Sequence, residues 1–235
     1  GFGGGKYLSF DGSANFATIP YTITDNLITV GFWYYSKVFS SNASLDALIS
    51  NYTSGISGFD VRLNSSTTIN LAISFSGSET GVSFGTIANN TWYYVVFTYD
   101  GATIKTYLDG VLKNSANRVG TRDNGTQICI GTSAYDTNRR ATCGIPQVMI
   151  YNRALSDAEI CDRLFRDYMS WLIDELYATH QIKITPGQEE ILHTDFQEEW
   201  PSMIEGKGGI YLATLDGIPS GVCTLKPISD KEVEL

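Results

Sequence analysis

The residues best suited to bind a ligand lie in one short loop. Residues 131–142 read GTSAYDTNRRAT and combine an aromatic ring, a carboxylate, an amide and two guanidinium groups. These groups belong to Tyr135, Asp136, Asn138, Arg139 and Arg140. Loops on a rigid scaffold are a common place for binding residues. We therefore predict a ligand-binding site in this loop, with an ordinary solvated loop as the alternative.

Two cysteines flank the loop, Cys129 and Cys143. A disulfide between them would close the loop and stabilise the fold by about 3 kcal/mol in the chain-entropy account. It would also indicate an oxidising compartment. The alternative is a pair of buried free thiols.

Five asparagines match the acceptor pattern for N-linked glycosylation, which requires Ser or Thr two residues later. They are Asn42, Asn51, Asn64, Asn89 and Asn124. With the cysteines, they predict an extracellular or surface-exposed protein, a virion surface included. The alternative is chance, because this part of the chain is rich in Asn, Ser and Thr.

Metal binding and catalysis have weaker signals. Calcium would need six to eight oxygen ligands, and four oxygen-bearing residues lie near one another in the sequence: Asp11, Asn15, Asp25 and Asn26. Their spacing matches no calcium loop, and turn formation accounts for Asp11-Gly12. His180 and His193 are too few and too far apart for a zinc site. We expect a non-catalytic protein with calcium as the one candidate ion.

The elements that would position these residues are strands. Residues 92–99 are aromatic or β-branched, and Asp100-Gly101 and Asp109-Gly110 separate them from two further strand-like runs. Asp-Gly between such runs favours a type I′ hairpin turn, in which both central residues have positive φ. Three consecutive antiparallel strands are therefore predicted here.

Similar runs recur through the first two-thirds of the chain. They cover residues 7–10, 15–20, 27–37, 47–52, 59–63, 68–75, 82–87, 127–131 and 145–151. Short strands at even spacing with turn residues between them predict an antiparallel β-sandwich or jelly roll. We assign it to residues 1–155, and expect Trp33 and Trp92 to pack in its core.

The pattern changes at Ser156, where Ser156-Asp-Ala-Glu159 is a capping box. A helical hydrophobic period follows to about Ala178, and Pro186-Gly187 then interrupts the chain. A second, acidic helix is predicted at 188–203, and strands at 209–215, 221–225 and from 232. Residues 156–235 therefore form an α+β segment in a chain that is otherwise mainly β.

Charge also separates the two parts. The net charge is -9, but residues 1–155 hold 10 Lys and Arg against 9 Asp and Glu, whereas residues 156–235 hold 6 against 16. Neither part has the basic face that nucleic acid needs. No run of about 18 apolar residues predicts a membrane span. The chain does not begin with Met, and we expect it to be a processed product or part of a longer protein.

Residues 6–160 resemble the laminin-G-like, concanavalin A-like jelly rolls of surface and secreted proteins. The resemblance is carried by YLSFDGSANFATIP, ITVGFWYY, WYYVVFTYDGATIKTYLDGVLKNS and VMIYNRALSDAEI, in the family's order. One departure is Ile145-Pro146-Gln147, where the family often has Ile-Asp-Glu. The resemblance implies a binding or adhesion module.

Residues 161–235 look like the beginning of a GNAT-type N-acetyltransferase. LFRDYMSWL and the stretch from DFQEEW to KEVEL carry this resemblance. The family's Gly-rich turn, whose amides hold the pyrophosphate of acetyl-CoA, does not occur in the sequence. An acetyltransferase activity is therefore not expected of this chain.

Three functions follow from these observations. The first is a non-catalytic adhesion module that recognises a glycan or protein surface through rim loops. The second is a structural subunit of an extracellular or virion assembly, which would contact identical neighbours in an oligomer, filament or shell. The third is a truncated acetyltransferase with a fused recognition domain.

Overall fold

The computed structural model describes residues 7–37, 46–53, 57–65, 67–136, 138–191, 194, 209–215, 218–227 and 233–234. These residues fall into two compact units, of which the first is Lys6–Asp157 and the second begins at Ala158. Each unit is described by itself below.

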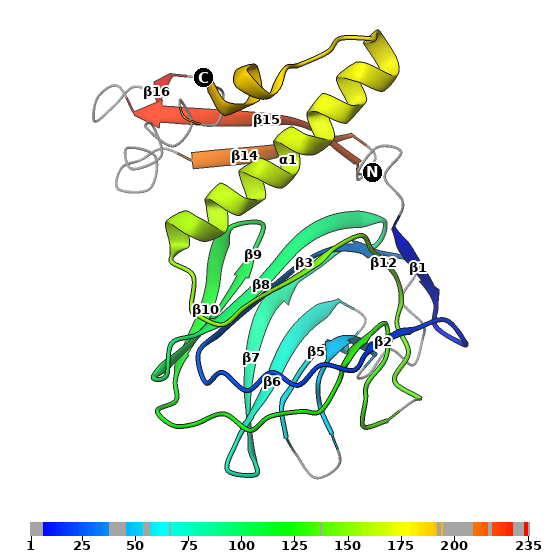
Figure 1. Ribbon diagram of the computed structural model, residues 1–235, viewed down its shortest axis with the longest axis vertical. Coiled ribbons are helices and arrows are strands. Elements are labelled where there is room, and N and C mark those ends of the chain that lie inside the picture. The colour runs from blue at the N-terminus through cyan, green and yellow to red at the C-terminus, as the bar shows by residue number, and fades with distance from the viewer. Residues whose placement is uncertain are drawn as a thin grey trace. The chain divides into compact units, whose positions relative to one another are not determined.

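The first unit is a two-sheet antiparallel sandwich, as predicted (Figure 1). In spatial order the seven-stranded sheet contains β1 (Leu8–Asp11), β12 (Thr142–Ile145), β3 (Ile28–Ser36), β8 (Thr91–Tyr99), β9 (Thr103–Leu108) and β10 (Val111–Asn117), and β13 (Val148–Tyr151) also pairs with β3. The six-stranded sheet contains β2 (Ala17–Ile19), β11 (Ile128–Ile130), β4 (Ala47–Ser50), β5 (Phe59–Ser65), β6 (Thr68–Phe75) and β7 (Ser78–Thr86).

The two predicted Asp-Gly hairpins are present, but their turns differ. Asp109 and Gly110 have φ of 55° and 76°, which is the type I′ pattern. At the other turn only Gly101 has positive φ. There the Asp100 carboxylate accepts hydrogen bonds from the N–H groups of Ala102 and Thr103, at 2.9 and 2.7 Å. Side-chain capping of this kind replaces the expected type I′ turn at Asp100.

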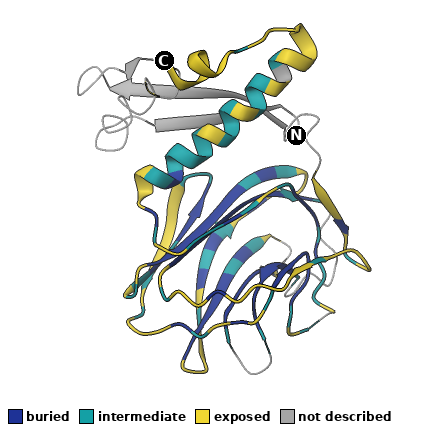
Figure 2. Cartoon of the chain, viewed as in Figure 1, coloured by how far each residue is buried: buried dark blue, intermediate teal, exposed yellow. Residues whose placement is uncertain are grey.

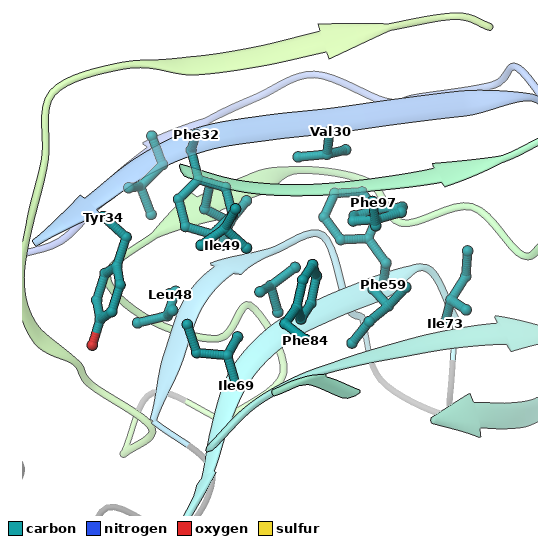
Figure 3. Packing of buried hydrophobic residues seen from close by; sticks show 14 of the residues in the cluster. Val30, Phe32, Tyr34, Leu48, Ile49, Phe59, Ile69, Ile73, Phe84 and Phe97 are labelled. Carbon is teal, nitrogen blue, oxygen red and sulfur yellow. The ribbon is translucent and has the colours of Figure 1, made fainter. Parts of the chain in front are cut away.

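Alternate side chains of both sheets form one hydrophobic core between them (Figure 3). From β3 and β8 it takes Phe32, Tyr34 and Phe97, and from β5 it takes Phe59 and Val61. Successive side chains of a strand point to opposite faces. Asp60 and Arg62 of β5 therefore lie on the outer face of the six-stranded sheet.

Trp33 and Trp92 are buried, with 2% and 4% exposure, but they are outside this core. Because Phe32 and Tyr34 face the core, Trp33 between them lies on the opposite face of β3. Its ring contacts that of Tyr94 at 5.2 Å. In Figure 2 the central strands of the first unit are mostly buried, whereas the edge strand β10 is mostly exposed.

The second unit contains most of helix α1 (Asp157–His180) and the sheet β14 (Gly209–Leu215), β15 (Ile218–Pro227) and β16 (Val233–Glu234). The helix continues past the predicted end at Ala178 and stops where Gln181 adopts a φ of 57°. Residues 186–191 and 194 are helical. Pro186 thus starts a helical segment and does not only break one. Thr185 and Gln188 cap it, since the Thr185 N–H donates to Gln188 Oε1 at 2.9 Å.

Candidate binding site on the six-stranded sheet

The predicted binding loop runs beside β4 and reaches over the outer face of the six-stranded sheet. The Ala47 N–H of β4 donates to the Arg139 carbonyl at 3.3 Å, and Ala47 and Arg140 form a parallel bridge. The Tyr135 and Tyr52 rings pack edge to face, with their centroids 6.3 Å apart. Tyr52 follows β4 in the chain, so both the backbone and an aromatic ring of the loop contact this region.

Beneath the loop lies a buried acid, Asp60 of β5, whose side chain has no exposed surface. Neither carboxylate oxygen accepts a hydrogen bond from any described residue. Two guanidinium nitrogens, Arg62 Nη1 and Arg139 Nη1, lie 3.6 and 3.8 Å from Oδ2. These are ion-pair distances, too long for hydrogen bonds.

Burial raises the pKa of the Asp60 carboxyl to about 6, although Arg62 and Arg139 act to lower it. Removal from water penalises the charged form, and here that penalty exceeds the attraction of two nearby cations. Asp60 therefore changes its charge at mildly acidic pH.

From Arg62 the contacts continue to β7 and to Tyr52. Arg62 Nη2 lies 2.7 Å from Glu79 Oε1, and the Tyr52 hydroxyl donates to Glu79 Oε2 at 3.0 Å. Burial, together with this hydrogen bond, raises the pKa of Tyr52 to about 12. The hydroxyl therefore remains a proton donor at any physiological pH.

From Arg139 the contacts continue along the loop. Arg139 Nε lies 3.4 Å from Asp136 Oδ2, and the Asn138 N–H donates to Asp136 Oδ1 at 3.0 Å. Tyr135 is 54% exposed, and Asn138 is also exposed. The groups offered to solvent are thus a tyrosine ring, an amide and the outer part of a carboxylate.

Seven residues linked by these contacts form what we call the Asp60 cluster: Tyr52, Asp60, Arg62, Glu79, Tyr135, Asp136 and Arg139. Three of the five predicted loop residues belong to it, and Asn138 joins through its backbone. Arg140 is placed differently, with its guanidinium carbon 5.4 Å from the Phe16 ring centroid.

Sequence reasoning missed Tyr52, Asp60, Arg62 and Glu79. A signal for two of them was available, since residues 59–63 read FDVRL. Alternation in a strand with one buried face would have placed Asp60 and Arg62 together on the other face. No local pattern marks Glu79 or Tyr52.

The expected disulfide is not formed, because Cys129 and Cys143 are both free. Cys143 belongs to the core, whereas Cys129 alternates with the core residues Ile128 and Ile130 and so faces outward from the other sheet. Cys129 Sγ lies 3.6 Å from Thr18 Oγ1. Burial raises the pKa of Cys143 to about 12. The alternative of two buried free thiols is the correct one.

One glycosylation candidate is wrong in the folded chain. Asn51 is fully buried, and its Oδ1 accepts the Phe59 N–H at 2.6 Å. Asn42 lies outside the described residues. The remaining three, Asn64, Asn89 and Asn124, are exposed. Their modification stays a prediction.

Several of the oxygens considered for calcium already accept hydrogen bonds. The Asp11 carboxylate accepts the N–H groups of Ser13, Ala14 and Asn15, and these hydrogen bonds lower its pKa to about 2. The Asp25 carbonyl accepts from the Arg122 guanidinium at 2.6 and 2.9 Å. No group of three or more His, Cys, Asp or Glu within the described part of the chain is arranged to hold a metal. These residues do not fit a calcium ion.

The comparison with known families agrees with this fold. A profile of the concanavalin A-like lectin/glucanases superfamily matches residues 2–161. The chain belongs to this superfamily. No curated protein matches it in sequence. Among its described residues no helix is long and apolar enough to cross a membrane.

Several solved structures share the fold. A heptameric SAP-like pentraxin from Limulus polyphemus has a TM-score of 0.52 at 18% identity, over 66% of this chain and 80% of the pentraxin. The binding domain of Paraclostridial Mosquitocidal Protein 1 has a TM-score of 0.56 at 16% identity, over 71% of this chain and 46% of that domain. The botulinum neurotoxin serotype G binding domain has a TM-score of 0.53 at 16% identity, over 67% of this chain and 41% of that domain.

At such identities these structures show the fold alone. The chain spans less than half the length of the two toxin domains. The profile ends at residue 161, and no comparison supports the expected acetyltransferase-like part at 161–235.

Proposed function

We propose that this superfamily member is a non-catalytic glycan-binding module of an extracellular or surface-exposed protein, and that the Asp60 cluster with Asn138 is its site. The observation that carries the proposal is the exposed Tyr135 ring beside the polar groups of Asp136 and Asn138. An aromatic face next to a few fixed polar groups suits a sugar ring, which has an apolar face and a rim of hydroxyls.

The cluster supports this role because its contacts hold Tyr135, Asp136 and Arg139 of the loop. Tyr135 contacts Tyr52, whose hydroxyl is held by Glu79. Asp136 contacts both Arg139 and the Asn138 backbone. A preformed loop loses little conformational entropy on binding. The names of the toxin binding domains are compatible with a recognition role, although those proteins share only the fold.

A glycan array with the purified chain tests the proposal. Tyr135→Ala should weaken binding to any glycan recognised by the wild type by about fivefold or more, because a ring contact is lost. Tyr21→Ala is the matched control, since Tyr21 is 56% exposed in the β2–β3 connection. Equal affinities of the wild type and the Tyr135 variant would show that the site is not at Tyr135. An array without any hit would reject glycan binding as the function.

A subunit of an extracellular or virion assembly is the competing function. One of the structures with this fold is named as a heptamer. A chain that binds no glycan but forms a defined oligomer by light scattering would favour this alternative. A further possible result is that the same loop binds the surface of another protein and not a glycan. The acetyltransferase-like part stays a prediction, which a coenzyme A titration would test.

A further inference from the structure

Each guanidinium of the Asp60 cluster lies between two carboxylates. Arg62 places Nη1 3.6 Å from Asp60 and Nη2 2.7 Å from Glu79. Arg139 places Nη1 3.8 Å from Asp60 and Nε 3.4 Å from Asp136. Both cations are therefore already compensated by the protein.

A guanidinium that can form a new bidentate contact is a favourable partner for the carboxylate or sulfate of an acidic sugar. In this cluster such a ligand would have to displace Glu79 from Arg62, or Asp136 from Arg139. The other cation of the loop, Arg140, lies over the Phe16 ring. The arrangement does not favour an anionic ligand.

The acids of the cluster also outnumber its two guanidiniums, because Asp60, Glu79 and Asp136 make three. Asp60 is fully buried, but the side chains of Glu79 and Asp136 are 33% and 36% exposed. A ligand over Tyr135 would therefore meet carboxylates. These accept hydrogen bonds from hydroxyls and repel other anions.

We infer that this site selects uncharged glycans over sialylated or sulfated ones, with Glu79 and Asp136 as the residues that set the specificity. The inference rests on the proposed glycan-binding function. A sugar hydroxyl would donate to Asp136 while the sugar face lies on Tyr135, and a carboxylate or sulfate near Asp136 would raise the energy of the complex.

Matched glycan pairs that differ by one sialic acid test this inference, for example lactose and sialyllactose, measured by calorimetry at neutral pH. The wild type should bind the neutral member at least about tenfold more tightly. Equal or tighter binding of the sialylated member would overturn the inference and leave glycan binding itself intact. Binding of neither member of any pair would instead reject the proposed function.

Variants that lack one acidic side chain of the cluster test the same inference with any pair of neutral and charged glycans. Glu79→Gln and Asp136→Asn each remove one of the two carboxylates beside a guanidinium, and each should reduce the preference for the neutral member about threefold or more. Asp25→Asn is the matched control, because it removes the same charge from an exposed residue of the β2–β3 connection. If Glu79→Gln and Asp136→Asn keep the preference of the wild type and of the control, with unchanged melting temperatures, Glu79 and Asp136 do not set the specificity.

Discussion

Two buried charged side chains of the sandwich, Arg122 and Asp60, differ in their hydrogen bonding. The Arg122 guanidinium donates to the carbonyls of Ile23, Asp25 and Asp123, at 2.6–3.3 Å. The Asp60 carboxylate accepts no hydrogen bond from any described residue. Arg122 thereby ties its own connection, 118–127, to the β2–β3 connection, whereas Asp60 only attracts Arg62 and Arg139 from a distance.

The difference indicates what each charge does. A buried charge with satisfied hydrogen bonds stabilises one arrangement of the chain, whereas one without them is costly in free energy. Buried polar groups left without partners are rare and call for an explanation. We therefore regard Arg122 as a structural residue, and the Asp60 cluster remains the proposed binding site. Three changes test this contrast.

Arg122→Ala should have the largest effect on stability. It leaves three carbonyls without their donors, and we expect the free energy of unfolding to fall by about 3 kcal/mol. Urea denaturation measures this. Arg118→Ala is the control from the same connection, because that guanidinium stacks on Phe75 at 5.1 Å and should contribute about 1 kcal/mol. Equal losses for the two variants would contradict the structural role of Arg122.

Asp60→Asn should change the pH dependence of stability. The pKa of Asp60 is raised from 3.8 to about 6 in the folded chain, so the folded state takes up the proton first and becomes more stable as pH falls through 6. From about pH 7.5 to about pH 5 this amounts to about 1 kcal/mol, which the variant should lack. Urea denaturation at both pH values checks this.

Asp46 and Asp109 provide the internal comparison for that experiment. Burial raises the pKa of each to about 6, so part of the stabilisation at low pH should persist in Asp60→Asn. A variant whose pH profile coincides with that of the wild type would show that Asp60 titrates outside this range.

Glu79→Gln should have the smallest effect on folding. Its pair with Arg62 is partly exposed, and such pairs contribute about 0.5 kcal/mol. Thermal unfolding at neutral pH should barely distinguish the variant from the wild type, although its glycan preference changes. A loss comparable to that of Arg122→Ala would mean that Glu79 is a structural residue.

Most of the fold could be predicted because its signals are local. Apolar alternation located most strands of the sandwich, and Asp109-Gly110 specified its turn through backbone conformation alone. The alternation missed β12, because one run at 145–151 was predicted where the structure has β12 and β13. The prediction for the turn at Asp100 was wrong in detail, because the geometry of this turn depends on hydrogen bonds from the N–H groups of two later residues. The disulfide prediction was wrong because Cys143 points into the core, whereas Cys129 points outward from the other sheet.

By itself the sequence determined a mainly β sandwich, the change to helix near residue 156, and a loop rich in binding groups at 131–142. Tertiary structure alone decided which residues meet that loop. Asp60, Glu79 and Tyr52 come from separate segments. The ion pair between Asp60 and Arg139 and the ring contact between Tyr52 and Tyr135 depend on strand order, on register and on the course of the loop beside β4. These long-range pairings arise from the packing of whole sheets, which no local pattern encodes.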